Sequence, residues 1–341
     1  MRVRVGLVML LAVAILTGAW WWWQDRRTTY EEALATLPVE TLRASYTDWA
    51  AVRGLIGAEP IDRFVKEAYE RDLSRLSALE VNGVLLEETY GIDLREVEWE
   101  AYAQSAEGSV AVLSVTDATG FDGIRDVLGS LGYDEPDSDD GAWAGSEELI
   151  ANLDRTATPI LQNLVLLEDD HLVVLSDDAA YAEGAGEVVR GDADSLLPEV
   201  ADLAEQAEDP VSAVLWAADY ACDDLAMSSA DDSDQERGRA LVDDAGGVSP
   251  VLGLLMAAGP AGDVRVAFGF ESDDQAAENL QPRTDLASGE APGLGGAFPD
   301  RFKVTAGATD GRLVVLDLEP VEDEPALLSA ISDGPVLFAT C

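Results

Sequence analysis

Residues Ser109–Tyr133 read SVAVLSVTDATGFDGIRDVLGSLGY, and this pattern decides the fold class. The stretch begins with mostly apolar and β-branched side chains, which are typical of a strand. Thr and Asp residues of the kind that cap helices come next, followed by apolar side chains at helical spacing. The pattern therefore predicts a strand that leads directly into a helix.

A similar block occurs at Asp263–Arg283, DVRVAFGFESDDQAAENLQPR. Two further pairs of blocks match in the same order along the chain. Ala44–Ile56 and Ala213–Ala226 each contain an extended segment that enters a helix. Leu164–Asp178 and Phe302–Pro320 each read as a β-hairpin with an acidic turn. Three matching blocks in one order predict an internal duplication.

Hairpins in series with intervening helices predict an α+β fold, in which two duplicated lobes of mostly antiparallel sheet carry packed helices. A parallel doubly wound sheet is the alternative. We expect the lobes at residues 37–194 and 209–341, with an amphipathic bridging helix at 195–208. Residues 28–36 are expected to be a short linker before the first lobe.

The chain begins with a long uncharged segment, Val5–Trp23, after a basic start. A helix of this length spans about 28 Å, close to the thickness of the hydrocarbon core of a bilayer. The segment predicts that residues 1–27 are an uncleaved transmembrane anchor and that the rest of the chain is extracytoplasmic. Cleavage of a signal peptide after Ala19 is the alternative.

Four consecutive tryptophans close this uncharged segment. Tryptophan prefers the membrane interface, where its ring is partly in apolar surroundings while its N–H stays hydrated. The residues that we expect at the outer interface are Trp20, Trp21, Trp22 and Trp23. Their position favours the anchor over cleavage.

The chain is strongly acidic, with 67 Asp and Glu against 21 Lys and Arg and a formal net charge of −46. Such a charge repels nucleic acid, which argues against direct nucleic-acid binding. The loop that holds Asp137, Asp139 and Asp140 resembles an EF-hand loop, but Pro136 stands where the first ligand is required. We therefore expect weak calcium binding there at most, and no other cofactor.

Two cysteines are present, Cys222 and Cys341. Outside the membrane, an even pair of cysteines is more often a disulfide than two free thiols. The sequence predicts that these two residues are joined.

Three polar residues near the end of a predicted helix, Asn279, Arg283 and Asp285, are more specific than a solvated loop requires. We expect Arg283 to form a buried ion pair, with ligand binding by the three residues as the alternative. The single histidine, His171, is expected in a hairpin turn. Ser176 follows it closely, but the chain has no G-x-S-x-G motif that would position a nucleophilic serine.

The segment LLEETYGIDLREVEWEAYAQSAEGSVAVLSVTD, Leu85–Asp117, contains an acidic helix end with Glu87, Glu88, Gly91, Ile92 and Asp93. It resembles a recurring pattern in uncharacterised, signal-anchored extracytoplasmic proteins of actinobacteria and related bacteria. The resemblance implies an extracytoplasmic location and a helix that leads into a strand pair. It supplies no active site.

These patterns favour a non-enzymatic accessory or binding module that is attached to the membrane and acts through an envelope protein or ligand of unknown identity. Two alternatives stay open at this point. One is a hydrolase of the cell envelope that uses paired carboxylates. The other is a protein that binds cations with low affinity.

Overall fold

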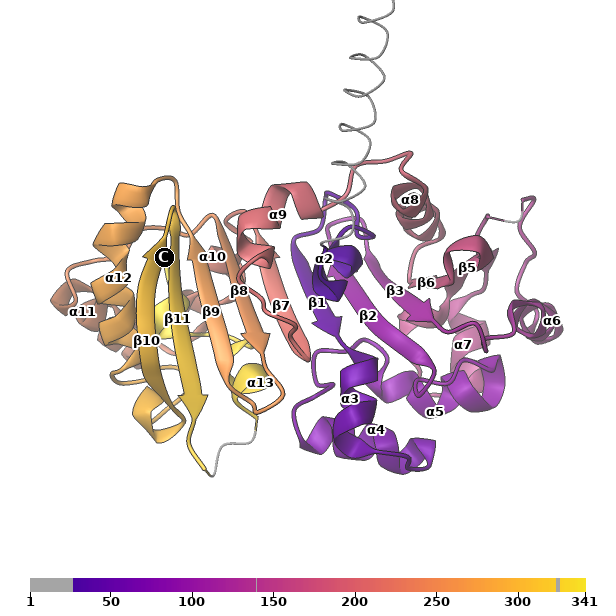
Figure 1. Ribbon diagram of the computed structural model, residues 1–341, viewed down its shortest axis with the longest axis horizontal. Coiled ribbons are helices and arrows are strands. Elements are labelled where there is room, and N and C mark those ends of the chain that lie inside the picture. Colours follow the sequence, from indigo (N-terminus) through magenta and orange to yellow (C-terminus); the bar gives the residue numbers. More distant parts are fainter. Residues whose placement is uncertain (1–26, 139, 323–325) are drawn as a thin grey trace, which may run out of the picture.

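The computed structural model describes residues 27–138, 140–322 and 326–341. Within these residues, eleven strands form one sheet that runs across the molecule (Figure 1). The strands of the first half are β1 (Arg43–Thr47), β2 (Val97–Gln104), β3 (Ser109–Val115), β4 (Trp143–Ala144), β5 (Asn163–Leu167) and β6 (Leu172–Ser176). The strands of the second half are β7 (Ser212–Ala217), β8 (Gly253–Ala258), β9 (Val264–Gly269), β10 (Phe302–Asp310) and β11 (Leu313–Pro320).

The sheet has the order β10-β11-β9-β8-β7-β1-β2-β3-β6-β5-β4, and each neighbouring pair of these strands is antiparallel. The predicted α+β class with an antiparallel sheet is confirmed. The parallel doubly wound alternative is wrong for the described strands.

The two halves have the same strand order when each is followed outward from the centre. The first half runs β1-β2-β3-β6-β5-β4 and the second runs β7-β8-β9-β11-β10, so the first five strands correspond and β4 is an addition to the first half. The expected lobes are not separate sheets, because β1 pairs with β7 from Arg43↔Trp216 to Thr47↔Ser212. This central β1–β7 pairing makes one continuous sheet out of both halves.

The helices occur between the strands along the chain and pack against the sheet. Those of the first half are α2 (Thr29–Leu34), α3 (Trp49–Ile56), α4 (Ile61–Glu70), α5 (Gly83–Leu85) with a π-helical turn at Leu86–Tyr90, α6 (Phe121–Leu131), α7 (Glu147–Leu153) and α8 (Ala179–Arg190). The connection to the second half contains α9 (Leu197–Ala204), inside the expected bridging segment 195–208. The second half contains α10 (Tyr220–Asp224), α11 (Asp232–Asp244), α12 (Asp273–Ala287) and α13 (Leu327–Ile331). Short 3-10 turns occupy Glu80–Asn82, Pro159–Leu161, Glu168–Asp170, Met227–Ser229, Phe298–Asp300 and Leu337–Ala339.

One face of the sheet carries a core that both halves share. Side chains alternate between the two faces along a strand, so Ala44 and Tyr46 of β1 point to the same face as Ala213 and Leu215 of β7. These four residues belong to one buried apolar cluster, which α2, α8 and α9 cover. We call this cluster the shared core.

The opposite face of the sheet carries two separate cores. The first-half core packs under α3, α4, α6 and α7, and the second-half core packs under α10, α12 and α13. On this face, β1 presents Ser45 and Thr47, two small polar side chains that belong to neither cluster. The two cores therefore do not merge above the central strand pair.

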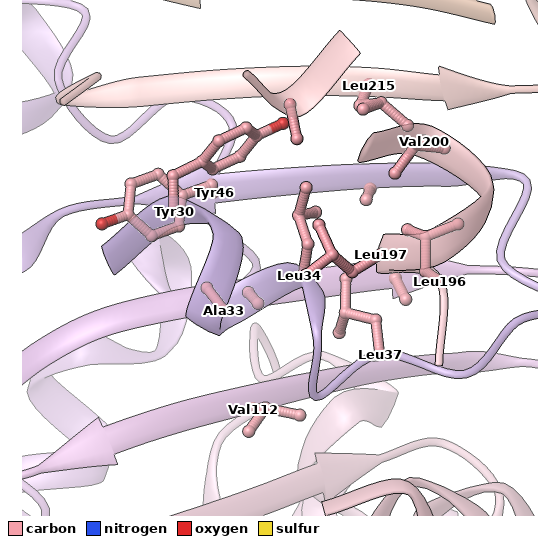
Figure 2. Packing of buried hydrophobic residues seen from close by; sticks show 14 of the residues in the cluster. Tyr30, Ala33, Leu34, Leu37, Tyr46, Val112, Leu196, Leu197, Val200 and Leu215 are labelled. Atoms are coloured by element: carbon pink, nitrogen blue, oxygen red, sulfur yellow. The ribbon is translucent and has the colours of Figure 1, made fainter. Parts of the chain in front are cut away.

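Residues 28–36 are not the linker that the sequence predicts. Thr28 caps α2 through a capping box with Glu31, and Tyr30, Ala33 and Leu34 are buried. Figure 2 shows Leu34 and Leu37 beside Leu196, Leu197 and Val200, so that α2 and the α9 region pack together over the sheet. The apolar side of this short helix makes it part of the shared core.

The predicted membrane anchor, residues 1–27, lies outside the described residues apart from Arg27. The same holds for the four tryptophans expected at the membrane interface, Trp20, Trp21, Trp22 and Trp23, so the anchor stays a prediction. Across residues 27–138, 140–322 and 326–341, no helix has both the length and the hydrophobicity needed to cross a bilayer.

A disulfide joins Cys222 at α10 to Cys341 at the C-terminus, with a Cα–Cα distance of 5.4 Å. The predicted pairing is confirmed. The bond closes a loop over a sequence separation of 119 residues. It fixes the C-terminal segment against the second-half core, to which Phe338 and Ala339 belong.

We predict that replacing both cysteines, Cys222→Ser with Cys341→Ser, lowers the free energy of unfolding by about 4–5 kcal/mol, because a cross-link over so long a loop restricts the unfolded chain. The measurement is urea unfolding of the oxidised wild type and the double variant. Reduced wild type is the control and should match the variant. A loss below about 1 kcal/mol would contradict the entropic account of this bond.

Candidate functional site

Two separate cavities on the face of the sheet that carries the two separate cores are lined by residues of both halves. The larger of the two has a volume of about 640 Å³. The first half contributes Arg43, Tyr69, Arg75, Leu76 and Gln104, and the second contributes Tyr220, Asp224, Ala326, Ser329, Ala330, Ser332 and Asp333. We call this cavity the inter-half groove. A smaller cavity of about 250 Å³ lies toward the other end of the central strand pair and includes Asp72, Ser212 and Leu328 in its lining.

The loop after α4 forms the first-half wall of the inter-half groove, and a buried carboxylate holds this loop in place. Glu100 on β2 is 1 % exposed. Its carboxylate accepts hydrogen bonds from Trp49 Nε1 at 3.0 Å, Ser77 Oγ at 2.5 Å and the Ala78 amide at 2.7 Å. Burial raises the pKa of Glu100 to about 7, although the hydrogen bonds from Ser77 and Trp49 act in the opposite direction.

A second attachment of this loop comes from β1. Ser45 Oγ donates a hydrogen bond to the Leu76 carbonyl at 2.7 Å. Leu76 and the neighbouring Arg75 both line the inter-half groove. Strands β1 and β2 therefore determine where the loop presents Arg75.

Asp72 links the two halves directly. Its Oδ2 accepts a hydrogen bond at 3.1 Å from the amide of Ser329, in the first turn of α13. Burial raises the pKa of the Asp72 carboxyl, while the hydrogen bonds from Ser329 lower it. The backbone of Asp72 has φ 60°, a left-handed conformation that is uncommon for a residue other than glycine. This hydrogen bond connects the loop after α4, in the first half, to α13, in the second half.

Arg75 rests on an aromatic ring at the wall of the groove. Its Nε donates to the Tyr69 carbonyl at 3.0 Å, and its guanidinium carbon lies 4.5 Å from the centroid of the Tyr69 ring. Stacking of this kind orients the planar guanidinium group.

Arg43 is held in a similar way above the central strand pair. Its Nη1 donates to Gln104 Oε1 at 2.9 Å. Its guanidinium carbon lies 5.6 Å from the ring centroid of Trp216, which is the residue of β7 paired with Arg43 of β1. Trp216 Nε1 in turn donates to Asp224 Oδ2 at 2.6 Å. The groove thus combines fixed guanidinium donors with hydroxyl and carboxylate groups, an arrangement that suits recognition of a polar ligand.

Arg283 is buried as expected, but it forms no ion pair with any acid that the structure describes. Its Nη1 donates to the carbonyls of Phe338 and Thr340, and its Nη2 donates to the Ser249 carbonyl. Burial lowers the pKa of Arg283 to about 9. Main-chain carbonyls replace the carboxylate because α12 packs against the C-terminal segment, which offers unpaired acceptors there. Arg283 therefore has a structural role.

Asn279 and Asp285 contact different residues in the fold. Asn279 is buried and bonds to Ser249, accepting from the Ser249 amide at 2.8 Å and donating to its hydroxyl at 3.0 Å. Asp285 contacts Gln281 Nε2 at 2.8 Å on the exposed side of α12. The predicted three-residue ligand site is thus not assembled, although Asn279 and Arg283 share Ser249 as a partner.

The acidic loop expected to bind calcium is only partly described, since Asp139 lies outside the described residues. Asp140 Oδ2 lies 4.0 Å from Arg190 Nη1, and Asp137 is a neighbour on the same exposed loop. In the part of the chain that the structure describes, no three His, Cys, Asp or Glu side chains are placed to hold a metal ion. Weak calcium binding at this loop stays a prediction.

His171 lies in the turn between β5 and β6, as expected, with φ 54°. Its Nε2 is 3.5 Å from Asp117 Oδ1. Ser176 is buried in β6 and donates its hydroxyl hydrogen bond to the Ser109 carbonyl at 2.7 Å. The two side chains therefore do not form a base and nucleophile pair.

The acidic helix end that carries the resemblance is a structural junction. Gly91 has φ 73° and ends the π-helical turn. Glu87 and Asp93 both form ion pairs with Arg95, at 2.5 Å and 2.7 Å. Ile92 is buried in the first-half core. The motif joins a helix to the strand pair β2–β3 and lies outside the inter-half groove.

Comparison with models of protein families finds no match, and comparison with curated proteins finds none. Two solved structures, titled "Structure of crystal form I of TP0453" and "Structure of crystal form III of TP0453", resemble this chain at 8 % and 7 % identity. The alignments cover 88 % and 87 % of this chain and 96 % and 95 % of the others, with TM-scores of 0.40 and 0.41. These scores are too low for the likeness to bear on fold or function.

We predict that Glu100 makes stability pH-dependent. Because the pKa of Glu100 is about 7 in the folded protein and about 4.5 when unfolded, folding takes up a proton between these values, and stability falls as pH rises through this range. The full loss is about 3 kcal/mol. Glu100→Gln stays neutral, so its free energy of unfolding relative to wild type should rise by up to that amount between pH 4.5 and 8.

The measurement is urea unfolding of both proteins across this pH range. A pH-independent effect of the amide on the free energy of unfolding cancels when the difference between the two proteins is compared at different pH values. Glu88→Gln, at an exposed position within the π-helical turn, is the matched control for removing one negative charge. An unchanged difference between Glu100→Gln and wild type at all pH values would show that burial does not raise the pKa of Glu100.

Proposed function

We propose that this chain is a non-enzymatic binding module and that the inter-half groove is its ligand-binding site. The observation that carries the proposal is the convergence of polar and aromatic side chains from both halves on one cavity of about 640 Å³. A volume of this size lies in the range of small-molecule sites, which are concave and carry a few fixed polar groups. Ligand contacts would come from Arg43 and Arg75 on one side and from α13 on the other.

The duplication predicted from the sequence supports this placement. The two halves share their strand order, and we infer that they arose from one ancestral unit. Each half completes its own core on the grooved face, so the space between the cores is available to a ligand. Sites between similar halves are a common location for ligands because both halves contribute side chains.

The proposed location is the outer face of a membrane, with the N-terminal segment as the anchor. The uncharged run Val5–Trp23 supports an anchor. The Cys222–Cys341 disulfide supports an oxidising, extracytoplasmic compartment. The partner would be a ligand or protein of the envelope. The formal charge of −46 argues against nucleic acid as the ligand.

A second candidate function, a hydrolase with paired carboxylates, is favoured by one observation. Asp224 and Asp333 both line the inter-half groove. Paired carboxylates on either side of a substrate are the basis of acid and base catalysis in glycoside hydrolysis. Turnover of a bound compound would favour this function over binding alone.

We predict that Ala330→Trp, which places an indole in the groove from α13, abolishes binding of ligands found by a thermal-shift screen of wild type. The library should contain amino acids, organic acids, sugars and phosphates. Ala151→Trp on the exposed side of α7 is the matched control and should bind as wild type does. Ligands that stabilise wild type and Ala330→Trp equally would contradict the groove as the site.

A further inference from the structure

The arginines of this chain differ in what they bind. Seven of the described arginines donate hydrogen bonds to carboxylates, as expected in so acidic a protein. This group contains Arg53, Arg63, Arg95, Arg125, Arg237, Arg265 and Arg312. Arg43 and Arg75 are not among these seven, and both line the inter-half groove. Arg71, Arg283 and Arg301 also donate to carbonyls instead, but they do not line this cavity.

Each of these two arginines lies near an acid without a hydrogen bond to it. Arg43 Nε is 3.8 Å from Asp224 Oδ2, and Arg75 Nε is 3.7 Å from Asp72 Oδ1. Asp224 instead accepts the Trp216 indole N–H, and Asp72 accepts the Ser329 amide. One oxygen of each carboxylate is thus engaged by another donor, whereas Asp72 Oδ1 is buried without a hydrogen-bond partner among the described residues. Neither acid is hydrogen-bonded to the outer ends of the two guanidinium groups.

The available donors are the terminal nitrogens. Among the described residues, Arg43 Nη2 and both Nη atoms of Arg75 make no hydrogen bond, since Arg43 uses Nη1 for Gln104 and Arg75 uses Nε for the Tyr69 carbonyl. The side chains are 21 % and 31 % exposed, so a solute can reach them. Stacking on Trp216 and Tyr69 holds the two planes in place before a ligand arrives. Such preorganisation reduces the entropy lost on binding.

We propose that the inter-half groove binds a small organic carboxylate, with Arg43 and Arg75 as the residues that recognise its charge. This inference rests on the proposed binding function. The guanidinium group matches a carboxylate because two parallel N–H donors face two oxygens. Tyr69 and Tyr220, on the two walls of the groove, offer aromatic surface for the rest of the ligand.

A single negative charge fits the groove better than several. Asp224 and Asp333 also line the cavity, and the whole chain carries a formal charge of −46. Both repel a phosphate dianion more strongly than a monocarboxylate. The carboxylate could belong to a free organic acid or to the C-terminus of a peptide, and the chemistry at the arginines is the same.

The test is calorimetric titration of the full chain with benzoate and with benzamide, its neutral analogue, at constant ionic strength. Benzoate should bind, and benzamide should bind at least tenfold more weakly. Arg43→Gln and Arg75→Gln should each weaken benzoate binding about tenfold or more, the range expected for a hydrogen bond to a charged group. Circular dichroism checks that each variant is folded, and Arg75, on a loop, tolerates substitution most easily.

Two matched variants separate recognition in the groove from general electrostatics. Arg63→Gln removes one positive charge from an exposed ion pair with Glu59 and should leave benzoate affinity within about twofold of wild type. Asp333→Asn removes a repelling charge from the groove and should strengthen benzoate binding. Further titrations with inorganic phosphate, and with a tripeptide bearing a free or an amidated C-terminus, distinguish the sources of the anion.

Equal binding of benzoate and benzamide would overturn the proposal, as would equal losses in Arg63→Gln and Arg75→Gln. Weaker benzoate binding in Asp333→Asn would show that this carboxylate assists the anion instead of repelling it, and would also overturn the proposal. A further outcome is that no carboxylate binds, but another compound binds to wild type and not to Ala330→Trp. In that case the carboxylate assignment fails and the binding function stands. If neither occurs, both proposals fail.

Discussion

The pairing of β1 with β7 is the interaction on which the rest of the structure depends. It joins two halves of equal strand order edge to edge, in a register from Arg43↔Trp216 to Thr47↔Ser212. Because strand side chains alternate, one pairing has two different consequences. On one face it merges both halves into the shared core under α2, α8 and α9. On the other face it leaves two cores with the inter-half groove between them.

The groove keeps its shape because polar groups tie its walls to the sheet. Glu100 is a costly residue to bury, and its three hydrogen bonds offset part of that cost by fixing the loop that carries Arg75. Asp72 connects the same loop to α13 in the other half through its hydrogen bond with the Ser329 amide. The stability of the fold and the geometry of the groove therefore depend on the same few side chains.

Local patterns predicted much of the fold. The matched blocks predicted strands β3 and β9, both hairpins and the helices that follow, because apolar periodicity and caps are encoded by neighbouring residues. The β1–β7 pairing has no such signal, since its strands are far apart in the sequence. The short segment TYEEAL reads as linker because its burial depends on contacts with α9.

The candidate site was harder to predict than the fold. Its residues come from β1, β2, α4 and the loop after it, α10, and α13 with the residues that flank it, and no motif connects them. Arg283 stood out as a rare base near an acid, and its true partners are main-chain carbonyls, which no residue pattern reveals. Glu100 lies between Trp99 and Ala101 in a strand whose sequence does not distinguish a buried acid from a solvated one.

Native-state hydrogen exchange of the central strands tests the continuous sheet most directly. If β1–β7 pairing makes both halves one cooperative unit, the slowest amides of β1, β2, β7 and β8 should exchange with one common free energy, equal to that of global unfolding. Their exchange should also respond equally to added denaturant. Exchange of β7 and β8 at a denaturant concentration that leaves β1 and β2 protected would show that the halves unfold separately, and would contradict the account.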